Sequence, residues 1–358
     1  MKYSINENSS LTAYMQLYEQ LRSDIINGVI PYKGKLPSKR LLAEETGVSV
    51  ITVEHAYSIL KDEGYIEARE RSGYFVIYRR EDVIPLAEHT EEYLPRKSHT
   101  ASDSEVFPYS VMAKTMRKVL TDYGEDILTR SVNKGCMELR EALRLYLARS
   151  PGINVSADQI IIGSGAEYLY SLIIQLLGRD KVYGIEDPSY EKIKLVYEAN
   201  GITTDMLLLG SDGIRSSELE RTGAEVLHVT PFNSYPSGIT AGASKRREYI
   251  RWAEKRGGYI IEDNYDSELT VSMKNDDTLF CMSERVIYLN TFSKTIAPSV
   301  RVGYMVLPES LAEKFENTLG FYSCTVPVFE QYVLAELINN GDFERHINRI
   351  RRRRRKNK

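Results

Sequence analysis

Cysteine, histidine and tryptophan are scarce in this chain, which has three cysteines, five histidines and one tryptophan among 358 residues. The cysteines are odd in number and far apart, so we expect reduced thiols rather than a disulfide framework. Neither the cysteines nor the histidines show the close spacing of metal ligands, and we therefore predict no bound metal. The residues are Cys136, Cys281, Cys324, His55, His89, His99, His228 and His346.

Long apolar runs are also missing. No stretch reaches the length of a transmembrane helix, and the start MKYSINENSS lacks a charged leader followed by an apolar core. The composition, with 42% hydrophobic and 27% charged residues, is typical of soluble globular structure, and the length is sufficient for two domains. We therefore expect a cytoplasmic protein.

The most informative segment is LNTFSKTIAPSVRVG, residues 289–303. A strand-like run leads into a loop that carries Lys294, and Arg301 follows seven residues later. A lysine in this setting is typical of one that forms a Schiff base with pyridoxal 5′-phosphate, with an arginine to neutralise the phosphate. A solvated loop charge is the alternative for this segment taken alone. Hydroxyl groups that could reach the phosphate belong to Thr291, Ser293 and Thr295.

A second segment, YIIEDNYDSE at residues 259–268, gives this interpretation a partner strand. An apolar run ends in Asp263, and a buried carboxylate at a strand end would keep the pyridine nitrogen of the cofactor protonated. Tyr265 would donate a hydrogen bond to the phenolic oxygen of the cofactor. Without the first segment, a helix cap is the more frequent role of an aspartate after a strand.

Together these segments resemble fold-type I aminotransferases, from about Phe107 to the C-terminus. The resemblance also covers GSGAEYLYSLI, EDPSYE and TPFNSYPSG. It implies an α/β domain with a mostly parallel sheet and helices on both faces. It also implies pyridoxal 5′-phosphate as the cofactor and Lys294 as the catalytic lysine.

The additional segments imply further cofactor contacts. In GSGAEYLY, residues 163–170, a glycine turn enters a helix, so the backbone N–H groups of Gly165, Ala166 and Glu167 would hold the phosphate. In EDPSYE, the aromatic residue two positions after the proline is Tyr190, which would stack on the cofactor ring.

The segment TPFNSYPSG departs from the family pattern. Where aminotransferases have an asparagine just before the proline, this chain has Tyr235. Asn233, two residues upstream, is our candidate for the contact with the cofactor oxygen. The alternative is an ordinary turn residue whose side chain bonds to its own backbone.

The first eighty residues show a different pattern. Apolar residues recur at helical spacing up to Asn27-Gly28, and a second helix is predicted from Ser38. A glycine-containing turn then leads to Ser49, which would cap a third helix. Two short strands around residues 69–73 would complete a winged helix-turn-helix. The residues expected to face inward are Tyr14, Leu17, Tyr18, Leu21, Ile25, Val53, Ala56, Tyr57 and Leu60.

The string LPSKRLLAEETGVSVITVEHAYSILKDEGYI closely resembles the winged helix of GntR-type regulators. The resemblance implies a double-stranded DNA operator as partner. Val50 is a departure, because the family often has arginine there, and an apolar residue removes a charged contact. A winged helix that binds protein is the alternative. The residues expected to contact DNA are Ser38, Lys39, Arg40, Ser49, Thr52, Arg69 and Arg71.

Residues 80–105 have no apolar period, which predicts a linker. We therefore expect a winged helix at residues 1–79, a linker at 80–105 and an aminotransferase-like domain at 106–358. This arrangement is that of MocR-type regulators, a branch of the GntR family that the chain resembles over nearly its whole length. A homodimer reading paired half-sites is expected.

The charge is concentrated at the C-terminus. The last ten residues carry eight positive charges, so a formal net charge of −3 leaves −11 for the rest of the chain. DNA affinity is therefore expected from local patches on the winged helix. In aminotransferases a helix like FERHINRIRR continues into a small lobe that holds the arginine for the substrate carboxylate, so we expect a truncated chain with this lobe incomplete. A solvated helix end in a complete protein is the alternative.

Three hypotheses follow for the function. The preferred one is a transcriptional regulator that senses an amino compound by aldimine exchange at Lys294, with the aminotransferase-like domain used for sensing rather than turnover. The second is an aminotransferase that carries a DNA-binding domain. The third is a fragment that retains only DNA binding. The effector, the operator and the direction of regulation stay open.

Overall fold

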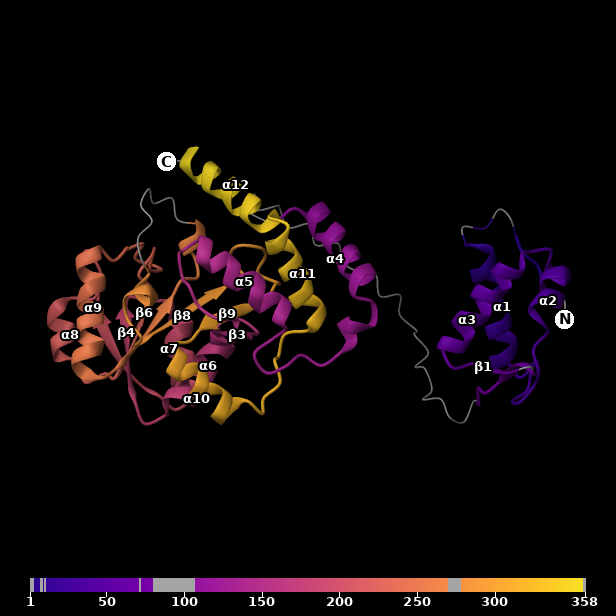
Figure 1. Ribbon diagram of the computed structural model, residues 1–358, viewed down its shortest axis with the longest axis horizontal. Coiled ribbons are helices and arrows are strands. Elements are labelled where there is room, and N and C mark those ends of the chain that lie inside the picture. The colour runs from indigo at the N-terminus through magenta and orange to yellow at the C-terminus, as the bar shows by residue number, and fades with distance from the viewer. Residues whose placement is uncertain are drawn as a thin grey trace. The chain divides into compact units, whose positions relative to one another are not determined.

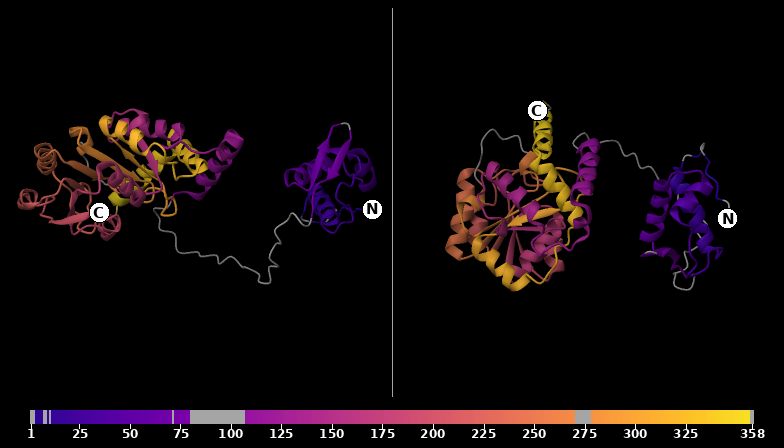
Figure 2. Two further views of the ribbon diagram at one scale, coloured as in Figure 1. Left: turned by 90° about the horizontal axis from the view of Figure 1, so that it is seen from below. Right: turned by 45° about the vertical axis from the view of Figure 1, so that its right-hand side comes forward.

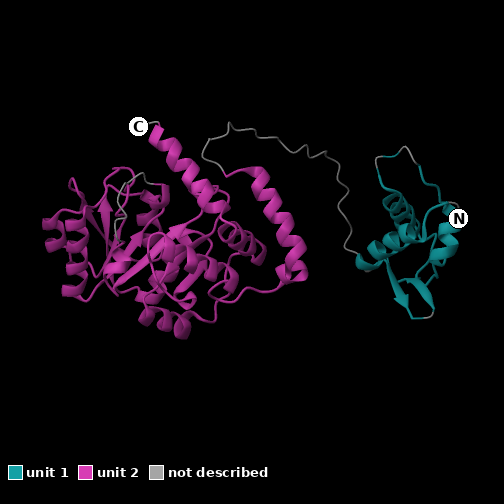
Figure 3. Cartoon of the chain, turned by 45° about the horizontal axis from the view of Figure 1, so that its top comes forward, with its two compact units in different colours: residues 1–98 teal, residues 99–358 magenta. Residues whose placement is uncertain are grey.

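The computed structural model describes residues 3–6, 9, 11–70, 72–79, 107–269 and 278–356. The chain divides into two compact units, Met1–Ser98 and His99–Lys358, which are coloured separately in Figure 3. The expected linker at 80–105, and with it the expected domain borders, lies outside the described residues, as does Arg71. Each unit is described by itself below.

The first unit is a winged helix-turn-helix, as predicted. Ser38 caps the second helix by accepting a hydrogen bond from the N–H of Leu41, and Gly47 ends it in the left-handed conformation, with φ 71°. Ser49 caps the third helix through the N–H of Thr52. The elements are α1 (Ala13–Ile26), α2 (Lys39–Thr46), α3 (Val50–Asp62), β1 (Ile66–Arg69) and β2 (Gly73–Val76), with the two strands antiparallel.

A small apolar core holds these helices together. The predicted inward residues are buried, apart from Tyr14, which is partly exposed and packs edge-on against His55. The hydroxyl of buried Tyr57 donates to the carbonyl oxygen of Pro37 at 2.8 Å, which ties α3 to the segment before α2. The middle of α3 is thereby fixed relative to the start of α2.

The second unit contains a seven-stranded sheet in the order β3-β9-β8-β7-β6-β4-β5 (Figure 1). All neighbouring pairs are parallel except the two that involve β9. The mostly parallel sheet predicted from the sequence is therefore confirmed. The strands are β3 (Ile160–Gly163), β4 (Val182–Asp187), β5 (Thr203–Leu208), β6 (Val226–Val229), β7 (Tyr259–Asp263), β8 (Val286–Thr291) and β9 (Gly303–Val306).

Helices cover both faces of this sheet. Successive strand residues point to opposite sides, and the apolar side chains on each side pack against helices. Ile161 packs in one apolar cluster with α6, α7 and α10, whereas Ile160 and Ile162 pack on the other face with α5 and α11. A further cluster joins α8 and α9 to the sheet near β5, and Figure 2 shows the layers from two more directions. The helices are α4 (Tyr109–Tyr123), α5 (Met137–Arg149), α6 (Ala166–Leu177), α7 (Glu191–Ala199), α8 (Ser216–Arg221), α9 (Ala243–Arg256), α10 (Glu309–Leu319), α11 (Val328–Asn339) and α12 (Asp342–Lys356).

Short 3₁₀ turns complete the unit, namely η2 (Gly124–Leu128), η3 (Ala157–Gln159), η4 (Ser267–Leu269) and η5 (Leu279–Met282). Because β3, β4, β6, β7 and β8 run in the same direction, their carboxyl ends meet at one edge of the sheet. In open α/β sheets this edge is where ligands bind. Across the described parts of the chain, no helix has the length and apolar character needed to cross a membrane, and no cluster of three or more potential metal ligands occurs.

Candidate functional site

The start of α3 is the candidate surface for reading DNA. Ser49 and Thr52 are joined there by a hydroxyl contact of 2.9 Å, in addition to the cap from Ser49 to the N–H of Thr52. Between them, Val50 and Ile51 are exposed, and Ile51 has 65% of its surface accessible. An apolar pair at the tip of this helix is suited to contact with thymine methyl groups rather than with phosphates.

The basic residues predicted to contact DNA differ in how freely they can do so. Arg40 is exposed and has no hydrogen bond or ion pair within the described residues. Lys39 is bound to Glu54 at 2.6 Å, an interaction that raises the pKa of the lysine and lowers that of the carboxylate. Arg69, on the wing, is bound to Glu67 at 2.7 Å and stacks over Phe75. Ser38 is exposed, but its oxygen is used as a helix cap.

The candidate cofactor residues gather at the carboxyl edge of the sheet in the second unit. Gly303 at the start of β9 pairs with Gly163 at the end of β3 and with Thr291 at the end of β8. The glycine turn follows β3, the Lys294 loop follows β8, and Arg301 precedes β9, so all three lie at the same end of three adjacent strands. Asp263 ends the next strand and pairs with Leu289 of β8.

Lys294 lies on the turn after β8. Its side chain is exposed and makes no hydrogen bond or ion pair to any described residue. The turn is closed by the hydroxyl of Ser293, which donates to the carbonyl oxygen of Val300 at 3.0 Å, while Thr291 is buried in the strand. Lys294 is therefore exposed on a loop closed by Ser293, and its amine has no partner among the described residues.

The glycine turn after β3 faces Arg301. A Cβ atom added to Gly165 would lie 3.0 Å from Nη2 of Arg301, and the φ of +92° at this position also favours glycine. The guanidinium group of Arg301 is ion-paired with the carboxylate of Glu167 in the first turn of α6. The N–H of Gly165 donates to the carbonyl oxygen of Gly163, which leaves the N–H groups of Ala166 and Glu167 for an anion.

Asp263 is buried, and two hydrogen-bond donors face its carboxyl group. The hydroxyl of Tyr170 donates to Oδ2, and the N–H of Tyr265 donates to Oδ1 at 3.2 Å. Burial raises the pKa of Tyr170 well above its usual value, so this tyrosine stays a proton donor. Nε2 of buried His228 lies 3.4 Å from Oδ2, and its Nδ1 is 2.6 Å from the hydroxyl of Tyr197. The hydrogen bonds from Tyr170 and Tyr265 fix the direction of the Asp263 carboxyl group.

Two further loops border this edge. Tyr190, the cap residue of α7, is exposed and packs edge-on against exposed Tyr235, with ring centroids 6.1 Å apart. The side-chain amide of Asn233 donates to Asp266 at 2.7 Å, and the backbone carbonyl oxygen of Asn233 accepts from the hydroxyl of Tyr265 at 3.1 Å. Burial raises the pKa of Tyr265 to about 12. Asn233 thus links Tyr265 to Asp266.

Tyr170, His228 and the Arg301–Glu167 pair were not predicted. Tyr170 lies one helical turn after Ala166, and His228 is on the strand next to the one that ends in Asp263. The proximity of both residues to Asp263 can be inferred only once the strand order is known. A fourth unpredicted group is Glu186 near the end of β4, where burial raises the pKa of the carboxyl to about 7. It accepts a hydrogen bond from Ser234 at 2.7 Å.

Comparison with known proteins identifies relatives for both units. Residues 13–76 match the family described as bacterial regulatory proteins, gntR family. The chain is 33% identical to the uncharacterized HTH-type transcriptional regulator YdeL of Bacillus subtilis, covering 97% of this chain and 78% of that protein. It is 26% identical to the probable rhizopine catabolism regulatory protein MocR of Rhizobium meliloti, covering 97% of this chain and 76% of that protein.

The second unit is similar to solved aminotransferase structures. The multiple substrate aminotransferase of Thermococcus profundus superposes with a TM-score of 0.63 at 25% identity, over 70% of this chain. The chain covers 65% of the length of that enzyme. The likeness therefore establishes the aminotransferase-like fold.

Proposed function

The chain belongs to the MocR-type branch of the GntR family of transcriptional regulators, and we propose that its second unit senses an amino compound with pyridoxal 5′-phosphate bound at Lys294. The observation that carries this proposal is the amine of Lys294, which no described residue pairs, on the loop after β8, beside the strand that ends in Asp263. When bound, the cofactor supplies an aldehyde that condenses reversibly with primary amines.

The edge of the sheet fits the phosphate group of this cofactor. The missing side chain of Gly165 leaves space in front of Arg301, which a Cβ atom would fill. The free N–H groups in the first turn of α6 add the partial positive charge of a helix N-terminus. Arg301 would exchange the carboxylate of Glu167 for the phosphate, because a dianion attracts the guanidinium group more strongly.

The same edge fits the ring of the cofactor. Asp263 would hold a proton on the pyridine nitrogen, since Tyr170 and the N–H of Tyr265 fix the direction of its carboxyl group. The exposed ring of Tyr190 would stack on the cofactor, and the hydroxyl of Tyr265 would turn from Asn233 to the cofactor oxygen. Each of these residues would bind or orient the ring.

Lys294 would act as the competitor of the effector. An incoming primary amine would compete with Lys294 Nζ for the cofactor, so the effector would release the lysine side chain. This release changes DNA binding only if the effector favours one arrangement of the protein over another. A near-complete switch from 1:99 to 99:1 requires a differential affinity of about 10⁴.

A second copy of the chain would complete the regulator. Large apolar side chains are exposed along α4, η2 and the start of α5, where solvation is unfavourable. A homodimer that buries this surface would present two winged helices to paired half-sites. The exposed side chains are Tyr109, Met116, Leu120, Leu128, Val132 and Met137.

Amino-group transfer is the second candidate function, and the aminotransferase-like fold of the second unit favours it. Lys294 would then also move a proton as a general base. Steady formation of a keto acid from an added amino acid would support this candidate over sensing. We rank sensing first because a DNA-binding unit occupies the same chain.

The proposal is tested by selecting DNA fragments from a random-sequence pool with the cofactor-loaded chain, and then adding a panel of amines. We expect one or more amines to change binding of the selected DNA by the unaltered chain and not by Lys294→Ala. Lys192→Ala, an exposed lysine beside Tyr190, is the matched control and should respond normally. An identical response with and without Lys294 would show that the lysine is not the switch.

A further inference from the structure

The last helix, α12, is anchored to the second unit by one face. Phe343, Ile347 and Ile350 are buried in the main apolar cluster. Arg351 donates to the carbonyl oxygen of Glu268 at 2.6 Å, and Arg354 reaches Asp266 at 3.5 Å. These contacts hold α12 against η4, the turn that follows Tyr265.

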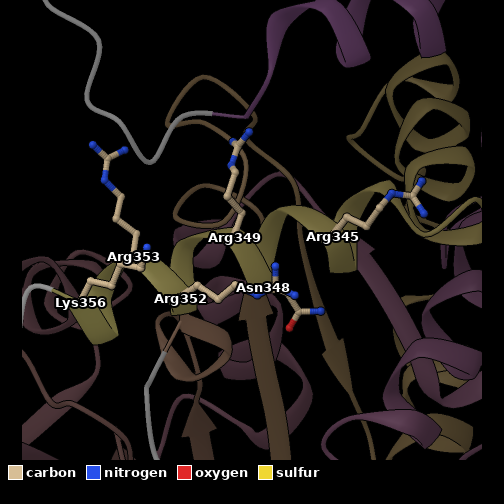
Figure 4. A pocket seen from close by; sticks show the side chains of 6 residues that line it. All are labelled: Arg345, Asn348, Arg349, Arg352, Arg353 and Lys356. Atoms are coloured by element: carbon tan, nitrogen blue, oxygen red, sulfur yellow. The ribbon is translucent and has the colours of Figure 1, made fainter.

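The opposite face of α12 is an exposed row of cations. Figure 4 shows a surface hollow along this helix that is lined by basic side chains and a single amide. Of the exposed cations, Arg352, Arg355 and Lys356 make no hydrogen bond or ion pair within the described residues. The residues lining the hollow are Arg345, Asn348, Arg349, Arg352, Arg353 and Lys356.

We propose that this exposed face of α12 is a second DNA-binding surface, which contacts the phosphates of double-stranded DNA held by the winged helix. The chain outside the last ten residues carries a formal charge of −11, so the body would otherwise repel DNA. A row of arginines on an anchored helix offsets this repulsion locally. The surface is distinct from the candidate cofactor site and does not depend on the cofactor.

The geometry of the helix suits a nucleic-acid backbone. Arg345 and Lys356 are eleven residues apart, which corresponds to roughly 16 Å along an α-helix. One strand of B-DNA carries about five phosphates over that axial distance. Guanidinium groups bind phosphate oxygens through paired N–H donors, and the helix that carries them is held in place by the contacts on its buried face.

The winged helix makes DNA the favoured partner over an acidic protein. Because both surfaces belong to one chain, DNA bound by the first unit is present at high effective concentration around the second. Contacts to phosphates read no sequence, so α12 would add affinity at any operator. Its contribution would decline as salt rises. Each phosphate that it neutralises would make the slope of log affinity against log salt steeper by about 0.9.

The test removes three charges that have no partner in the described part of the protein. The full chain carrying Arg352→Gln, Arg355→Gln and Lys356→Gln is titrated with a random-sequence duplex of about six helical turns. We expect affinity to fall by up to roughly fivefold for each phosphate no longer neutralised at about 0.15 M salt, and the salt slope to decrease by about 0.9 for each such phosphate.

A matched control removes three charges from another helix. Arg247, Arg251 and Lys255 on α9 are also exposed and lack hydrogen bonds or ion pairs to described residues. Their replacement by glutamine should leave the affinity and the salt slope close to those of the unaltered chain. Equal reductions in the two triple variants, or an unchanged slope for the α12 variant, would overturn the proposal. Weaker binding to poly-glutamate with unchanged binding to DNA would also overturn it and indicate an acidic protein partner.

Discussion

Replacing Glu167 by glutamine should strengthen binding of pyridoxal 5′-phosphate. Glu167 occupies Arg301 through an ion pair, and both side chains are substantially exposed, at 37% and 52%. A pair this exposed contributes at most about 1 kcal/mol, so its release makes the guanidinium group available at little loss of stability. Glutamine has no charge to compete with a phosphate.

The expected gain combines two contributions. Freeing Arg301 contributes up to about 1 kcal/mol to the free energy of binding, because the ion pair no longer has to be broken. Removing a negative charge roughly 5 Å from a phosphate in a water-like medium gives about 0.8 kcal/mol for each phosphate charge. Allowing for partial solvent screening, a total of about 1 to 2 kcal/mol corresponds to binding that is roughly five- to thirtyfold tighter.

The affinity is measured by titrating the full chain with pyridoxal 5′-phosphate, with pyridoxal as the ligand that lacks the phosphate. Glu167→Gln should bind the phosphorylated ligand more tightly and pyridoxal unchanged. Glu309→Gln is the matched control, because Glu309 is exposed in the first turn of α10. Unchanged or weaker binding of the phosphorylated ligand by Glu167→Gln would refute the assignment of Arg301 to the phosphate.

Three further substitutions test the electrostatics and the winged helix. Burial raises the pKa of Glu186 from 4.5 to about 7, so between these values the folded chain keeps a proton that the unfolded chain loses. The free energy of unfolding should therefore fall as pH rises through this window, by at most about 1.4 kcal/mol per pH unit from this group, and urea titrations should show a smaller fall for Glu186→Gln. An equal fall in both proteins would contradict this. Ser49→Ala should lower the thermal stability of the winged helix by about 1 kcal/mol, because the cap of α3 is removed, and no change in the melting curve would argue against that cap. Glu54→Gln should raise DNA affinity by releasing Lys39, as measured by fluorescence anisotropy, whereas weaker binding would show that the ion pair orients the lysine for DNA.

Much of the fold could be predicted from local sequence signals. Ser38 and Ser49 mark helix starts because their side chains satisfy free N–H groups, and both caps are confirmed. The burial of Val53, Ala56, Tyr57 and Leu60 follows from their helical spacing.

The side-chain partners in the candidate sites depend on contacts between distant segments, which the sequence pattern does not contain. Tyr170 reaches Asp263 across 93 positions, and Arg301 reaches Glu167 across 134. The pairing of Lys39 with Glu54 likewise depends on how α2 packs against α3. These contacts become visible only after the elements are assembled, because they require the order of strands and the crossing of helices.

The central claim is that Lys294 holds the cofactor, and the most direct test is to locate the covalent attachment. The full chain is incubated with pyridoxal 5′-phosphate, reduced with borohydride and digested, and the modified peptide is identified by mass spectrometry. The account predicts one stoichiometric adduct on Lys294 that an excess of effector amine prevents, with Lys294→Ala unlabelled and Lys192→Ala labelled normally. Labelling scattered over several surface lysines, or unchanged in Lys294→Ala, would contradict it.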